Sequence, residues 1–119
     1  MPQPPPKGIP AREAAVITVS DRSARGERPD RSGPAVARAL SRAGFRVASL
    51  RVIPDERAPL SAAIRSLSRR VALVVTTGGT GLAPRDVTPE ATRKVIDREI
   101  PGLAERMRLA GAGRTPYAA

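Results

Sequence analysis

The sequence predicts an α/β domain of three layers, in which helices cover both faces of a mostly parallel sheet. Short apolar runs alternate with segments whose apolar residues recur every three or four positions, which is typical of strands followed by helices. Successive parallel strands are joined by right-handed crossovers. A length of 119 residues corresponds to one domain that is able to bury a core.

The first half of the chain contains two expected strands with a helix between them. Residues 13–20 are apolar or β-branched and predict a short buried strand. The polar, arginine-rich residues 21–33 predict a loop. Apolar residues spaced by three and four predict a helix over 33–43, and Gly44 suits its C-terminal end. Residues 45–53 have a mixed pattern with strand-like content, so we expect a strand near one edge of the sheet.

The middle of the chain repeats this order of elements. Leu60, Ala63, Ile64 and Leu67 share one face of an expected amphipathic helix. The continuous apolar run at residues 71–75 is typical of a parallel strand that helices cover on both faces.

A further helix is expected after the glycine-rich segment. Thr88 suits its N-cap, and the proline that follows suits the first helical position, where the missing N–H costs nothing. Val95 and Ile96 would carry the apolar stripe of this helix. Residues 101–102, Pro-Gly, are expected to end it before another helix over about 103–110.

Composition limits the available chemistry. The chain has no cysteine and no histidine, which excludes disulfides, thiolate metal sites and the usual general base. Acid, base or metal chemistry therefore falls to carboxylates. The proline-rich residues 1–12 are expected to be a disordered leader, with the folded domain at 13–119. Since no apolar run is long enough to span a membrane, the expected location is the cytoplasm.

The net charge of +10 raises the possibility of nucleic-acid binding. The basic residues are scattered, however, and only Phe45 and Tyr117 could stack on bases. An arginine-rich, solvated surface is therefore the favoured interpretation, and a small nucleic-acid-binding protein stays an alternative. The local cluster of basic residues between the first strand and the first helix consists of Arg22, Arg25, Arg28 and Arg31.

Three polar segments leave the carboxyl ends of the three expected strands. They are Ser20-Asp21, Pro54-Asp55 and Thr76–Asp86. Ligands of open α/β sheets bind outside the carboxyl ends of the strands. We therefore expect these segments, far apart in the sequence, to meet at one ligand-binding end of the sheet.

The third segment contains the glycine cluster Gly78, Gly79 and Gly81. Glycines allow positive φ and the close approach of a ligand to backbone N–H groups, which suits a phosphate. A tight strand-to-helix connection is the structural alternative. The cluster matches neither the dinucleotide-binding fingerprint nor the P-loop, so those two classes lose support.

Two carboxylates accompany this expected phosphate site. Asp55 ends one strand and Asp86 follows the glycines. Carboxylates that face a phosphate site suit Mg²⁺-dependent phosphoryl or nucleotidyl transfer. Structural roles in turns or caps stay open for both residues, and more so for Asp21, since an aspartate after a strand is ordinary turn chemistry.

Together these motifs resemble one family. TTGGTG (76–81) followed by RDVTPEAT (85–92), with VSDR (19–22), PDE (54–56) and DREIPGLAERMR (97–108), is similar to the MogA/MoaB proteins of molybdenum cofactor biosynthesis. The plant and gephyrin G domains are relatives. The resemblance extends from about Ala14 to Tyr117.

The resemblance implies a MoaB/Mog-like fold with Rossmann-like crossovers and a molybdopterin adenylyltransferase. This enzyme uses ATP and Mg²⁺ to form adenylylated molybdopterin and pyrophosphate. It implies Asp55 and Asp86 as the critical carboxylates, while the metal ligands stay unassigned. Residues implied around molybdopterin and phosphate, including Arg85 of the basic rim, are Thr76, Thr77, Gly78, Gly79, Thr80, Gly81, Ser20, Asp21 and Arg85.

Family members are usually trimers, sometimes hexamers, so a homotrimer is expected, with the molybdenum-insertion protein as a further partner and with no nucleic acid or membrane. The family continues beyond the position of Tyr117 with a further buried strand and a PGSP-like loop. We therefore expect the domain to be C-terminally incomplete. A non-catalytic module that binds molybdopterin or acts as a scaffold stays an alternative.

Overall fold

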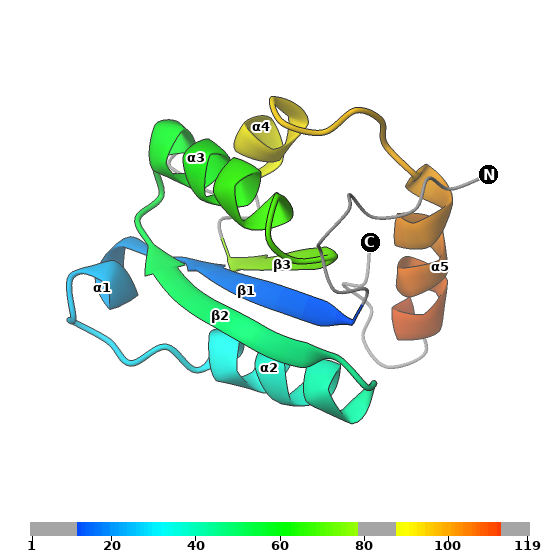
Figure 1. Cartoon of the computed structure of the whole chain (residues 1–119), viewed down its shortest axis with the longest axis horizontal. Coiled ribbons are helices and arrows are strands. Elements are labelled where there is room, and N and C mark those ends of the chain that lie inside the picture. The colour runs from blue at the N-terminus through cyan, green and yellow to red at the C-terminus, as the bar shows by residue number, and fades with distance from the viewer. Residues whose placement is uncertain (1–11, 79–87, 113–119) are drawn as a thin grey trace.

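Three parallel strands form the sheet in the computed structural model, which describes residues 12–78 and 88–112. The described strands are β1 (Glu13–Val19), β2 (Arg46–Ile53) and β3 (Leu73–Gly78), in the spatial order β2-β1-β3 (Figure 1). Both pairings are parallel, so each needs a crossover connection. The α/β fold class predicted from the sequence is confirmed.

Strand β1 is the buried centre of the sheet. Ala14, Ala15, Val16 and Ile17 have no solvent exposure. Helices pack on both faces of the strand, which explains why its apolar residues run consecutively instead of alternating with polar ones.

Helices cover the two faces of the sheet and complete the three layers. Helix α2 (Ser32–Arg42) lies on one face, and α3 (Arg57–Ser68) and α4 (Thr88–Arg93) lie on the other (Figure 1). Since side chains of a strand alternate between faces, odd-numbered residues of β1 join the core beneath α3. That core consists of Ala15, Ile17, Val19, Leu60, Ala63, Leu67, Val71 and Ala91.

Strand β2 lies at one side of the described sheet, as expected. Its residues alternate between exposed and half-buried over Arg46–Leu50, and Leu50 is 40% exposed. The register pairs Val19 of β1 with Ile53 of β2 and with Gly78 of β3. The three strands therefore end at the same level, as the position of a shared site requires.

The structure corrects the expectation of a loop over 21–33. Residues Asp21–Ala24 form a short helix, α1. The Ser20 hydroxyl accepts a hydrogen bond from the backbone N–H of Ser23 at 3.2 Å, and Asp21 lies in the first turn. A serine cap and an acidic first turn both stabilise a helix N-terminus, so the polar sequence forms a helical turn.

Strand β3 lies further along the chain than residues 71–75. Val71 is buried in the core before the strand begins, and the strand then continues through Thr76 and Thr77 to Gly78. These residues pair with Ile17, Thr18 and Val19. Three residues expected in the glycine loop thus belong to the sheet, because the central strand offers partners for them.

The last two helices also differ from the expected pattern. Helix α4 ends at Arg93, so Val95 and Ile96 do not form a stripe on it. Helix α5 spans Pro101–Ala112, and Pro101 therefore begins a helix, as its fixed φ permits. Helix α5 lies on the side of the molecule opposite α1 (Figure 1).

Two expectations concern the ends and the environment of the chain. The expected leader, 1–12, lies outside the described residues except for Arg12. Within the described ranges, no helix combines the length and the hydropathy that crossing a membrane needs.

Candidate functional site

The exits of β1 and β2 are tied together at the carboxyl end of the sheet. The backbone N–H of Ser20 donates to the Ile53 carbonyl at 2.9 Å. The backbone N–H of Asp55 donates to the Asp21 carboxylate oxygen Oδ1, also at 2.9 Å. Ser20, Asp21 and Asp55 therefore form one corner, as the sequence predicted. Carboxylate oxygen Oδ1 of Asp55 is buried there.

The end of β3 lies directly against β1 at Gly78. Its φ is +88°, and a Cβ at this position would collide with the Val19 carbonyl oxygen. Only glycine combines this backbone angle with such a close approach. The absence of a side chain thus lets the exit of β3 lie beside the exit of β1.

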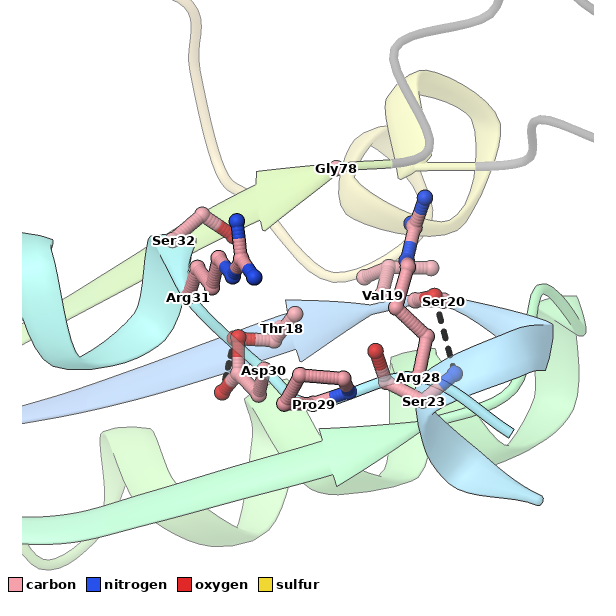
Figure 2. A pocket seen from close by; sticks show the side chains of 10 residues that line it. All are labelled: Thr18, Val19, Ser20, Ser23, Arg28, Pro29, Asp30, Arg31, Ser32 and Gly78. Carbon is pink, nitrogen blue, oxygen red and sulfur yellow. Dashed lines mark hydrogen bonds between the residues drawn. The ribbon is translucent and has the colours of Figure 1, made fainter. Parts of the chain in front are cut away.

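A cavity of about 450 Å³ opens beside these strand ends (Figure 2). Two of the residues predicted for the site, Ser20 and Gly78, line it. Thr76 and Thr77 pair within the sheet, and the Asp21–Asp55 corner lies outside the lining. The described lining residues are Thr18, Val19, Ser20, Ser23, Arg28, Pro29, Asp30, Arg31, Ser32 and Gly78.

Asp30 is the main described residue of this site that the sequence analysis did not single out. Its Oδ2 accepts a hydrogen bond from the Thr18 hydroxyl at 3.0 Å, and its Oδ1 accepts from the Gly33 backbone N–H at 3.0 Å. Arg31, at the N-cap of α2, makes no side-chain cap bond. An aspartate three residues before a helical N–H is a capping signal that was present in the sequence.

Arg28 and Arg31 supply positive charge to the cavity. Figure 2 shows their side chains on opposite sides of the cavity, with that of Arg28 directed toward Gly78. Among residues 12–78 and 88–112, neither guanidinium forms an ion pair. Both charges are therefore available to an anion, and guanidinium groups match the geometry of phosphate oxygens.

Arg25, in the same basic cluster, is engaged differently. It forms an exposed ion pair with Glu27 at 3.1 Å. The hydrogen bond and the charge of Arg25 lower the pKa of Glu27, and the hydrogen bond and charge of Glu27 raise the pKa of Arg25. The charges around the cavity are thus uneven, because Glu27 neutralises Arg25 and, among the described residues, no ion pair neutralises Arg28 or Arg31.

Part of the predicted site lies outside the described residues. This holds for Gly79, Thr80, Gly81, Arg85 and Asp86. The residues on either side of that segment are close to each other, because the Thr88 hydroxyl donates to the Gly78 carbonyl at 3.1 Å. Thr88 was expected as the N-cap that precedes the helix, but it is the first residue of α4, and its hydroxyl joins the start of α4 to the end of β3.

Carboxylates are the side chains of this site that could hold a metal ion. The described ranges contain no cluster of three or more histidine, cysteine or acidic side chains able to hold an ion. The Asp21 carboxylate nevertheless accepts a hydrogen bond from the backbone N–H of Asp55, which makes these two acidic residues neighbours. Since Mg²⁺ is commonly bound by one or two carboxylates together with substrate phosphates and waters, this donor set fits Mg²⁺ that arrives with a phosphorylated substrate.

The fold and the site define a parallel α/β domain with a basic cavity for an anion at the carboxyl ends of its strands. Residues 15–115 match the family model described as a probable molybdopterin binding domain. The chain belongs to this family, the MogA/MoaB molybdopterin-binding domains, which confirms the resemblance seen in the sequence.

Relatives and solved structures agree with this assignment. The chain is 43% identical over 97 residues to the molybdopterin adenylyltransferase of Escherichia coli, matching 78% of this chain and 50% of the relative. It is 43% identical over 103 residues to a molybdenum cofactor biosynthesis bifunctional protein of Synechococcus elongatus, matching 86% and 32%. The structure of the molybdopterin biosynthesis enzyme MoaB from Thermus thermophilus superposes with a TM-score of 0.79 at 48% identity, covering 89% of this chain and 68% of that one.

The matched region is only part of these relatives. The chain spans about half the length of the Escherichia coli enzyme and about a third of the Synechococcus elongatus protein. The match shows that the chain belongs to a protein family of molybdenum cofactor biosynthesis. The enzymatic activity of the longer relatives is a proposal for this chain.

Proposed function

We propose that this chain provides the molybdopterin site of an adenylyltransferase, which transfers AMP from ATP to molybdopterin and releases pyrophosphate. The observation that carries the proposal is the meeting of Ser20, Asp21, Asp55 and Gly78 at one end of the sheet, beside a basic cavity. The 43% identity to an enzyme named molybdopterin adenylyltransferase supports the choice of reaction.

The chemistry of the proposed reaction suits a chain without histidine. The attacking group is a terminal phosphate oxygen of molybdopterin, which is already anionic at neutral pH, so no strong general base is needed. The protein has to bring two anions together and screen their repulsion. Arg28 and Arg31 supply positive charge in the described part, and Arg85 is proposed to add to it.

The two proposed catalytic carboxylates are Asp55 and Asp86. Bound Mg²⁺ would supply charge neutralisation between phosphate groups. The roles proposed for the remaining residues are contacts to molybdopterin and phosphate, made by Ser20, Asp21, Arg85 and residues 76–81. A cytoplasmic location, a homotrimer or hexamer, and contact with the molybdenum-insertion protein complete the proposal.

The test is pyrophosphate release from ATP, with molybdopterin and Mg²⁺, by the purified chain. Asp55→Asn is expected to reduce the rate about a hundredfold, because a neutral amide would hold the Mg²⁺ that screens the reacting phosphates less well than a carboxylate. The fold should survive, since Asp55 bonds to Asp21 through its backbone N–H. Asp86→Asn should likewise remove turnover.

Asp97→Asn is the matched control, because Asp97 is exposed and lies outside the cavity lining. Its rate should equal that of the unmodified chain. A rate for Asp55→Asn equal to that of this control would contradict the role proposed for Asp55.

A second candidate function is binding of molybdopterin without catalysis. It is favoured by the family description, which names binding, and by the partial coverage of the enzymes. Molybdopterin bound with a measurable Kd, but no pyrophosphate release at any Mg²⁺ concentration, would select this function over the first.

A further inference from the structure

Asp30 connects two rigid elements that are distant in the sequence. Thr18, its partner through Oδ2, is on the central strand and is 3% exposed. Gly33, its partner through Oδ1, is in the first turn of α2. The carboxylate therefore anchors the end of the loop that leads from α1 to α2 to both the sheet and a helix.

Space around this contact is closely filled. A Cβ on Gly33 would collide with Asp30 Oδ2 and lie 2.5 Å from the Thr18 hydroxyl oxygen. The carboxylate thus lies between a buried strand and the backbone of a buried helical residue. Such a side chain has little freedom to take another position, so the loop backbone at Asp30 is held as well.

The two unopposed arginines of the cavity flank this anchor. Arg31 follows Asp30 directly, and Arg28 precedes it across Pro29, whose ring restricts φ. Arginine side chains are long, and ordering them on binding has an entropic cost. Holding their backbone in advance reduces that cost for an anionic ligand.

We propose that Asp30 is a positioning residue that, through Thr18 and Gly33, holds Arg28 and Arg31 in place to bind the phosphate groups of the ligand. The inference rests on the proposed function for the identity of that ligand. Binding of a simple phosphate anion tests it separately, without any turnover.

Two effects of Asp30 on anion binding have opposite signs. Its negative charge lies beside the arginines and repels an anion, so removing the charge alone should tighten binding. Its hydrogen bonds order the loop, so removing the bonds should weaken binding. The direction of the change therefore distinguishes positioning from simple electrostatics.

The experiment measures the Kd of inorganic pyrophosphate for the full chain by calorimetry at low ionic strength. Asp30→Ala, which removes both charge and bonds, is expected to weaken binding about tenfold, and Thr18→Val, which removes one bond without changing charge, about threefold. Asp30→Asn keeps an acceptor for Gly33 and a group that can bond Thr18. Its binding should equal or exceed that of the unmodified chain.

Circular dichroism identifies variants that fail to fold, and hydrogen exchange supplies a second readout. Backbone exchange across residues 28–31 should be faster in Thr18→Val than in the unmodified chain, with α3 unchanged. Tighter binding in folded Asp30→Ala, unchanged binding and exchange in Thr18→Val, or no pyrophosphate binding by the unmodified chain would each overturn the proposal. If the unmodified chain binds pyrophosphate but releases none from ATP in the presence of molybdopterin and Mg²⁺, only the proposed function would be overturned.

Discussion

The carboxyl end of the sheet and helix α5 use their side chains in opposite ways. At the carboxyl end, polar Thr18 is 3% exposed and hydrogen-bonded to Asp30. On α5, the apolar residues Leu103, Met107 and Leu109 are 61%, 74% and 78% exposed. Burying a polar group is costly unless it is paired, whereas exposing an apolar one gives up the gain from burial. The comparison indicates where sequence changes will have large effects and where they will have small ones.

The largest effect is expected where the backbone of β3 meets β1. Gly78→Ala should destabilise the domain by about 4 kcal/mol, because it combines an unfavourable positive φ with a collision against the Val19 carbonyl. Gly26 is the matched control, since its φ is +76° and nothing lies within 4 Å of its Cβ position. Gly26→Ala should cost about 1 kcal/mol. Urea unfolding measures both, and equal costs would show that the contact with β1 does not matter.

A core leucine and a leucine of α5 sharpen the same comparison. Leu60 has no solvent exposure, so Leu60→Ala should destabilise the domain by about 3 kcal/mol through lost burial and a cavity. Leu109 is 78% exposed, and Leu109→Ala should change the free energy of unfolding by less than about 0.5 kcal/mol. A large loss for Leu109→Ala would mean that α5 packs against something in solution.

A smaller effect is expected at the buried hydroxyl that joins α3 to α4. Ser61 donates to the Ala91 carbonyl at 3.0 Å, and Ser61→Ala leaves that buried acceptor without this bond. The expected cost is about 1 kcal/mol. Ser68 makes a comparable bond to the Arg65 carbonyl at 3.0 Å but is exposed, so Ser68→Ala should be close to neutral in thermal unfolding. Identical changes in Tm for the two variants would show that burial does not make the Ser61 hydrogen bond more important than that of Ser68.

The smallest effect concerns the exposed Arg25–Glu27 pair. The pKa of Glu27 is lowered, so the pair is present above the ordinary glutamate pKa and is lost as the pH falls through the lowered value. Glu27→Gln should leave stability unchanged and, by releasing Arg25, tighten pyrophosphate binding about twofold at low salt. The difference should vanish in acid, where Glu27 is protonated. If the difference in binding persisted in acid, the charge of Glu27 could not be the cause of the tighter binding.

Local patterns predicted the elements of this fold well where one interaction dominates. The buried run of β1 and the apolar spacing of α3 were recognisable, because burial on one or both faces requires a fixed period. The ends of elements were less predictable. Strand β3 extends to Gly78 because β1 supplies backbone partners, and α4 stops before Val95 although the sequence contains no strong break there.

The candidate site likewise contains residues that could be predicted from the sequence and one that could not. Ser20, Asp21 and Asp55 could be expected together because parallel strands end on one side of a sheet. Asp30 was missed because its importance depends on Thr18, which is 12 residues away and looks like an ordinary strand residue. Neither a loop composition nor a strand pattern reports which hydroxyl meets which carboxylate.

By itself, the sequence determined the order of the three strands and of the longer helices between them, the parallel α/β class, the family and the absence of histidine and cysteine chemistry. Only the tertiary structure decided that the Arg28–Arg31 loop is anchored to the central strand and that the exit of β3 lies against Val19. The physical reason is range: periodicity and capping act between neighbours in the chain, whereas these contacts act between segments that meet only when the sheet has formed.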